Sequence, residues 1–98
     1  MRELRFKKDF LEPILSGIKT QTARPSTHIK AGDTVSAVAS REKIKELKIL
    51  SVEKRTLSSF TDADAEREGC VDLDDFKAVW KRIYSKFDPN QVVSVIRW

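Results

Sequence analysis

The chain has 98 residues and a net charge of +4; 40% of its residues are hydrophobic and 35% are charged. A chain this short buries roughly 60–65% of its unfolded surface in one core, so we expect a single domain over residues 1–98 and exclude a second. The composition is too apolar for a disordered chain, and no apolar run is long enough for a membrane span or typical of a signal segment, so we expect a folded, cytoplasmic protein without a membrane partner.

The first part of the sequence predicts two strands on either side of a short helix. Residues 2–6 alternate enough for a strand with Leu4 and Phe6 facing inward. An apolar run at helical spacing follows, and Gly17 comes after it, as is typical of the left-handed residue that ends a helix. A second strand is expected over residues 19–24.

The middle of the sequence predicts two further strands. Gly32 and Asp33 lead into residues 34–38, which alternate with a period of two. Residues 40–46 are mostly charged, and we expect a tight or mobile connection there. Aliphatic and β-branched residues dominate the start of 47–55, which predicts one long strand whose end runs into solvent.

The last part predicts two helices and a closing strand. Thr61 precedes an acidic turn and Gly69 ends the segment, so a short helix is predicted over residues 62–68. An apolar stripe at helical spacing predicts a second helix. The stripe consists of Leu73, Phe76, Val79, Trp80, Ile83 and Tyr84. We expect Trp80 in the core, and residues 91–98 as a last strand in which Trp98 closes the sheet rather than stacking on a base.

This order of elements excludes a doubly wound parallel sheet, because helices do not alternate with the strands. Strands joined by short loops pair antiparallel, and a small twisted sheet with helices at its ends closes into a partial barrel. We therefore predict an α+β fold, a partly closed β-barrel of mainly antiparallel strands with three short helices.

Residues 19–24 are unusually polar for a strand, since neither of their faces is strongly apolar. One interpretation is the wall of a functional site. The other is a sheet edge with solvated side chains, which the pattern alone favours.

The distribution of charge and of metal-binding residues narrows the function. Residues 1–30 hold seven Lys and Arg against three Asp and Glu, so the whole positive excess lies there. Such a local excess is expected for a protein that binds a polyanion or phosphate. It is equally expected for a lysine-rich surface without a partner. Cys70 and His28 are the sole members of their types, so one chain forms neither a disulfide nor a Cys/His zinc site. We expect no metal and no cofactor, with Cys70 a packing residue and His28 exposed.

The segment Gly17-Ile18-Lys19-Thr20-Gln21-Thr22-Ala23-Arg24 fits a G-x-K-x-x-[T/E]-x-R signature at every fixed position. On this motif, and on the order and spacing of Gly32-Asp33, the helix ending at Gly69 and the last strand, the chain resembles the ASCH domains, small relatives of the RNA-binding PUA fold. The resemblance covers nearly the whole length. It implies a PUA-like barrel of five or six strands with the motif lining a cleft.

Some small ASCH domains are amidohydrolases that remove the acetyl group of N4-acetylcytidine, and others are associated with RNA binding or RNA cleavage. By position, the resemblance implies that Lys19, Thr22 and Glu68 are the catalytic set. Without it, Glu68 is interpreted as a surface residue of an acidic helix.

Amide hydrolysis needs a nucleophile, a base and a donor to the developing oxyanion. A partly desolvated Lys19 amine is able to accept the proton of the Thr22 hydroxyl, with Glu68 orienting the lysine or passing the proton to the leaving amine. On a regular strand residues 19 and 22 face opposite sides, so the scheme requires either a bulge near Thr20 or a lysine that reaches in from the helix–strand loop.

Two other functions use the same residues. The first is RNA binding, in which basic side chains would contact the phosphates. The second is RNA cleavage in the same cleft. The candidate substrate-binding or RNA-binding residues are Thr20, Arg24, Lys7, Lys8 and Lys30, together with Lys19 in the RNA-binding case. The expected partner is a nucleoside or RNA, and the expected state is a monomer or weak homodimer.

Overall fold

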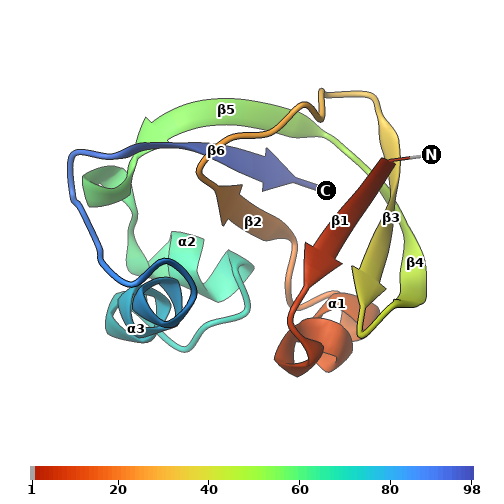
Figure 1. The fold of residues 1–98 in the computed structure, drawn as a ribbon, viewed down its shortest axis with the longest axis horizontal. Coiled ribbons are helices and arrows are strands. Elements are labelled where there is room, and N and C mark those ends of the chain that lie inside the picture. The colour runs from red at the N-terminus through yellow and green to blue at the C-terminus, as the bar shows by residue number, and fades with distance from the viewer. Residues whose placement is uncertain (1) are drawn as a thin grey trace.

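Two three-stranded sheets form the frame of the protein in a computed structural model that describes residues 2–98 (Figure 1). The first sheet has the order β1-β3-β4, made of β1 (Arg2–Phe6), β3 (Thr34–Ala39) and β4 (Glu42–Lys48). The second has the order β2-β6-β5, made of β2 (Gln21–Arg24), β5 (Ser51–Thr56) and β6 (Val92–Arg97). Within residues 2–98 the paired strands are antiparallel except β1 and β3, which run parallel. The long connection between these two strands, through a helix and β2, permits parallel pairing.

Three α-helices and two short 3-10 helices connect the strands of the described chain. They are η1 (Lys8–Phe10), α1 (Leu11–Ser16), η2 (Leu57–Ser59), α2 (Asp62–Arg67) and α3 (Leu73–Tyr84). As predicted, Gly17, whose φ of 82° is left-handed, caps the C-terminal end of α1, and Thr61 caps the N-terminal end of α2. The Thr61 hydroxyl accepts from the Asp64 backbone and the Asp64 carboxylate accepts from the Thr61 backbone, which forms a capping box.

The prediction for residues 40–55 was wrong, because the expected connection is mostly strand and the expected long strand is two. Ser40 and Arg41 have φ values of 51° and 66°, so they form the tight turn of a hairpin between β3 and β4. β4 lies at a sheet edge with most side chains exposed, and a charged sequence is compatible with such a strand. The chain then leaves the first sheet at the buried Ile49 and enters the second after Leu50, whose N–H bonds to Arg97 of β6.

The two faces of β6 bury side chains in two different cores. Val93 and Val95 pack in a cluster with α2, α3 and the 57–60 segment, whereas Ile96 packs in a cluster with β1, β3, β4 and α1. This alternation follows from the two-residue period of a strand. Figure 1 shows the consequence: α2 and α3 lie on one side of β2, and α1 with the first sheet lies on the other.

An α+β fold with mainly antiparallel strands and three helices is therefore confirmed, whereas a partly closed barrel is not shown by the two separate sheets. Trp98 does join the two sheets, because its ring forms a T-shaped pair with Phe6 of β1, at 5.8 Å between centroids, and its backbone N–H donates to the backbone oxygen of Thr20, just before β2. None of the helices in residues 2–98 combines the length and apolar character needed to span a bilayer.

Candidate functional site

The motif lysine enters the site from the loop between α1 and β2. After Gly17 reverses the chain, the Lys19 N–H bonds to Pro13 O at 2.9 Å, and the Thr20 N–H bonds to Arg67 O at 2.8 Å. β2 begins only at Gln21, so Lys19 is not bound by the alternation of the strand. Of the two arrangements that the sequence left open, the lysine reaching in from the loop is the observed one.

The Lys19 side chain is 2% exposed and its amine is surrounded by acceptors. Nζ donates to Gln21 O at 2.9 Å and to Glu68 O at 2.5 Å, and it lies 3.7 Å from Glu68 Oε1. The ring of Phe10 lies 4.4 Å below it, measured to the ring centroid. Burial lowers the pKa of Lys19, and the nearby Glu68 carboxylate opposes part of that shift.

Glu68 lies at the C-terminal end of α2 and is 4% exposed. Its Oε2 accepts a hydrogen bond from Gln21 Nε2 at 2.8 Å. Burial raises the pKa of this carboxyl, against the pull of Lys19 and Gln21. Burial therefore disfavours the charged form of both partners, and the attraction between the two charges opposes that effect in each.

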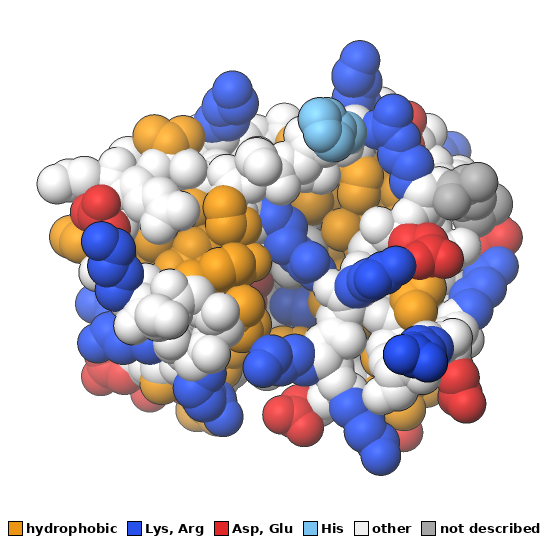
Figure 2. Space-filling view, viewed as in Figure 1, with side chains coloured by type: hydrophobic (Ala, Val, Ile, Leu, Met, Phe, Trp, Pro, Cys, Tyr) orange, Lys and Arg blue, Asp and Glu red, His pale blue; other side chains and the backbone are white. Residues whose placement is uncertain are grey.

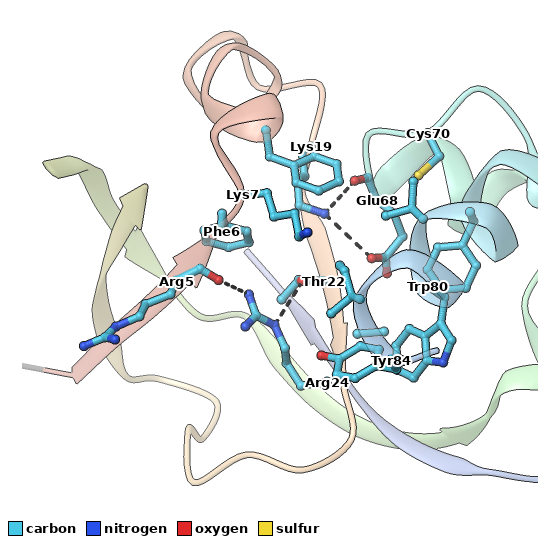
Figure 3. A pocket seen from close by; sticks show the side chains of 15 residues that line it. Arg5, Phe6, Lys7, Lys19, Thr22, Arg24, Glu68, Cys70, Trp80 and Tyr84 are labelled. Carbon is cyan, nitrogen blue, oxygen red and sulfur yellow. Dashed lines mark hydrogen bonds and ion pairs between the residues drawn. The ribbon is translucent and has the colours of Figure 1, made fainter. Parts of the chain in front are cut away.

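Thr22 and Arg24 lie beside this pair on β2 (Figure 3). Thr22 is 5% exposed, and Arg24 Nε donates to its Oγ1 at 3.4 Å. Arg24 Nη2 donates to Arg5 O at 2.5 Å, and its guanidinium lies 5.1 Å from the centroid of the Phe6 ring. Burial lowers the pKa of Arg24, but a guanidinium with an ordinary value above 12 stays charged at neutral pH.

A cavity of about 270 Å³ connects these groups, and its walls differ in chemistry. Lys19, Thr22, Arg24 and Glu68 supply a polar end. The remaining wall is largely apolar and aromatic, formed by Phe6, Phe10, Ala23, Phe76, Val79, Trp80, Ile83 and Tyr84, with Arg5, Lys7 and Cys70 also lining the cavity. Figure 2 shows the corresponding hollow, with hydrophobic side chains gathered along one wall and Lys and Arg side chains in its middle.

The structure gathers some of the predicted site residues and separates others. Lys19, Thr22 and Glu68 line one cavity with Arg24, and the exposed Lys7 also lines it. Three predicted binding residues do not line the cavity, namely Thr20, Lys8 and Lys30. Thr20 instead ties the loop to α2 and to Trp98 through its backbone, and Lys8 and Lys30 are exposed.

The interpretation of residues 19–24 as a solvated edge was wrong. β2 is an edge strand of its sheet, but Gln21, Thr22 and Ala23 are all buried, because α2 and the cavity wall cover them. The packing role expected of Cys70 agrees with its burial, which raises the pKa of the thiol to about 11, with Asp75 adding to the shift. His28 is exposed, as expected.

Sequence reasoning missed two parts of the site. The first is Gln21, whose buried amide joins Glu68 to two arginines and which nothing in the motif singled out. The second is the aromatic wall on α3, where Trp80 and Tyr84 contact each other at 4.3 Å between centroids. The helical stripe identified these aromatic residues as core, and it carried no signal that the same face also borders a cavity.

The sequence matches no family model and no curated protein, but the fold matches known structures. An ASCH domain from Lactobacillus crispatus superposes with a TM-score of 0.78 at 15% identity, covering 89% of this chain and 67% of that one. A protein from Enterococcus faecalis, assigned to the family named DUF984, superposes with a TM-score of 0.69 at 18% identity, covering 91% of this chain and 64% of that one. The chain therefore has the fold of an ASCH domain, and it spans about two thirds of the length of these two proteins.

Proposed function

We propose that this protein is a small amidohydrolase that removes the acyl group from an N4-acylated pyrimidine nucleoside such as N4-acetylcytidine. The observation that carries the proposal is the convergence of an amine, a hydroxyl and a carboxyl group on one cavity, from Lys19, Thr22 and Glu68. The ASCH fold supports the proposal only by analogy. A fold alone does not determine function, so the proposal depends on the site.

The chemistry assigns one role to each group. The Thr22 hydroxyl attacks the acyl carbon while the Lys19 amine takes its proton, the C–N bond breaks, and the departing amine takes a proton relayed through Glu68. Water then hydrolyses the acyl ester on Thr22 and releases acetate. The lowered pKa of Lys19 favours this base role, because a larger fraction of the amine is neutral at pH 7 than for a solvated lysine.

Within residues 2–98, Thr22 Oγ1 is hydrogen-bonded to Arg24 rather than to Lys19. Catalytic hydrogen bonds are often long in proteins without substrate and tighten when it binds. We therefore assign Arg24 the task of holding the hydroxyl and the substrate carbonyl side by side, with its cation available to the developing oxyanion.

The shape and lining of the cavity suit one pyrimidine. Its volume of about 270 Å³ is near the lower limit of roughly 300 Å³ for small-molecule sites, so it suits a small ligand. Trp80 and Tyr84 offer aromatic contacts to a planar base, and the polar end receives the amide.

The test is release of acetate from N4-acetylcytidine by the purified protein. Lys19→Ala and Thr22→Ala should each lower kcat/KM by at least about 100-fold, the scale of a lost general base or nucleophile. Lys30→Ala and Thr34→Ala are matched controls, because both residues are exposed and neither lines the cavity. Wild-type rates in both site variants would refute this assignment.

A second candidate function, RNA binding, is favoured by the basic rim of the cavity. Arg5 and Lys7 are exposed there, whereas Lys19 is too deeply buried and too well bonded to contact a phosphate. The logarithm of the association constant for single-stranded RNA should then fall linearly with the logarithm of the salt concentration, with a slope of roughly 0.7 per phosphate neutralised. Lys7→Ala should reduce that slope. Binding that is insensitive to salt would refute it, and shortening of a labelled RNA during the assay would indicate cleavage.

A further inference from the structure

Gln21 is a fully buried amide that connects the Lys19–Glu68 pair to a second charged cluster. Its side chain is 0% exposed. Its Oε1 accepts from Arg97 Nε at 3.0 Å and from Arg67 Nε at 3.3 Å, while its Nε2 donates to Glu68 Oε2 at 2.8 Å. The amide therefore lies between two guanidinium groups on one side and a carboxyl group on the other.

The two arginines determine the orientation of this amide. A guanidinium has N–H donors and no acceptor, so it is the amide oxygen that must face Arg67 and Arg97. Both arginines are held by Asp64, whose Oδ1 lies 2.9 Å from Arg67 Nη2 and 3.6 Å from Arg97 Nη2. Rotating the amide by half a turn would set its NH₂ against two cations and its oxygen against a carboxylate, which loses all three hydrogen bonds.

This orientation makes the two oxygens of Glu68 inequivalent. Oε2 faces the amide N–H and must act as an acceptor, whereas Oε1 is the oxygen that lies 3.7 Å from Lys19 Nζ. We infer that Gln21 is a positioning residue that keeps Glu68 Oε2 unprotonated, so that Oε1, beside Lys19, is the oxygen that takes up and releases the proton. The catalytic use of this arrangement rests on the proposed function, but the arrangement itself does not.

Other charged and polar groups around Glu68 bear on its titration from several elements. Lys19 and Arg24 from the motif and Arg55 from β5 favour its ionised form, as does the backbone N–H of Ala23. The negative groups are Asp64, on the same helix, and the Cys70 thiol when ionised, and both disfavour ionisation. Within residues 2–98, Gln21 is the side chain that donates a hydrogen bond to Oε2.

The sharpest test is Gln21→Glu, because it keeps an oxygen for the arginines and exchanges the donor for an acceptor. Two carboxyl groups would then meet at Oε2 and share a proton, so the pKa of Glu68 should rise by at least about one unit. The shift is measured by NMR titration of the glutamate carboxyl carbons, with the Glu68 signal assigned from its loss in Glu68→Gln. In the hydrolase assay, the acid limb of the kcat/KM profile should move to higher pH with it, and kcat at pH 7 should fall roughly 10-fold.

Gln21→Met removes the hydrogen-bond donor without adding charge. If Gln21→Glu does not fold, this second variant tests the positioning role of Gln21. The pKa of Glu68 should again rise, because the ionised form loses a hydrogen bond. Arg55→Lys is the matched control. It keeps the positive charge that favours ionisation of Glu68, and Arg55 contacts Asp64 but not Gln21, so the Glu68 titration should stay in place.

The outcomes separate the two proposals. A Glu68 titration that is unchanged in both Gln21 variants overturns the positioning role, even if the wild-type protein hydrolyses its substrate. If the Glu68 titration shifts in the Gln21 variants but the wild-type protein releases no acetate, the positioning of Glu68 is supported and the hydrolase is refuted.

Discussion

The two ends of α2 carry two buried carboxyl groups with opposite properties. Asp64, in the first turn, is 2% exposed, and Glu68, at the C-terminal end, is 4% exposed. Burial raises the pKa of each, but at Asp64 the hydrogen bonds from Arg55, Thr61 and Arg67 outweigh burial and hold the pKa far below its ordinary range. At Glu68 burial prevails and the pKa is raised.

The difference teaches that the donors around a carboxyl group, together with the strength of its desolvation, decide its protonation, and that a low exposed fraction alone does not. Arg55 binds both oxygens of Asp64, at 2.9 and 2.8 Å, and the first turn of the helix adds the N–H of Thr61. Glu68 has a neutral amide at hydrogen-bond distance and an amine at 3.7 Å, and it lies at the end of the helix where the dipole disfavours a negative charge. One end is built for structure, and the other takes up a proton more readily than a solvated carboxyl group does.

The largest expected effect is the loss of the structural end. Asp64→Asn keeps the shape of the side chain but leaves Arg55 and Arg67 without their anion, so it should reduce the free energy of unfolding by about 3–5 kcal/mol. Urea unfolding measures this, with the exposed Glu66→Gln on the same helix as the control. Equal losses in the two variants would mean that the cluster around Asp64 contributes nothing special.

The acid dependence of stability should follow from the same residue. Since the folded pKa of Asp64 lies below its unfolded value of about 3.9, its contribution is complete above that pH and is lost as the pH falls toward the folded value. Between pH 5 and pH 2, the free energy of unfolding should fall further for wild type than for Asp64→Asn, by an amount on the order of 2–3 kcal/mol. Parallel stability curves for the two proteins over this range would contradict the expectation.

A smaller effect is expected at Gly69, where the chain leaves Glu68. Its φ is +88°, and an added Cβ would lie 3.4 Å from the Cβ of Lys19. Gly69→Ala should therefore cost roughly 1–2 kcal/mol of stability through left-handed strain, and the new methyl group, in van der Waals contact with the Lys19 stem, should lower kcat by restricting that side chain. Gly32→Ala is the control for backbone strain, because Gly32 has a φ of +90° and an added Cβ there would have no neighbour within 4 Å. If both variants lower kcat equally, the contact with Lys19 has no role.

The smallest expected change in stability belongs to Glu68→Gln. An uncharged amide removes the cost of burying the carboxylate and still accepts from Gln21. The Lys19 amine, whose pKa burial already lowers, loses its proton rather than remaining an unpaired buried cation, so the free energy of unfolding should change by less than about 1 kcal/mol. Activity should nevertheless fall at least about 100-fold, because the amide carries no transferable proton. A stability loss as large as that of Asp64→Asn would erase the contrast between the two ends of α2.

The sequence predicted those parts of the molecule that depend on local signals. The glycine that ends α1, the cap of α2 and the stripe of α3 are encoded within a few residues, and the structure has them. The exposed edge strand β4 was missed because its charged residues hide the alternation. The parallel pairing of β1 with β3 was missed because it joins residues more than 30 positions apart.

The candidate site follows the same division. Lys19, Thr22 and Glu68 came from the motif and its resemblance, and the position of Lys19 before β2 resolved the conflict with the strand period. Gln21 was beyond reach, because its partners Arg67 and Arg97 lie 46 and 76 residues away. No local pattern contains contacts of that kind.

The wall that α3 contributes to the cavity comes from a different part of the chain than the polar end. Its cavity-lining residues, Phe76, Val79, Trp80, Ile83 and Tyr84, come from one helix, whereas the polar groups come from the α1–β2 loop, β2 and α2. Replacing a single side chain on that helix therefore reshapes the cavity while leaving Lys19, Thr22 and Glu68 in place. The size and shape of the cavity are therefore open to change through the side chains of one helix, independently of the polar end.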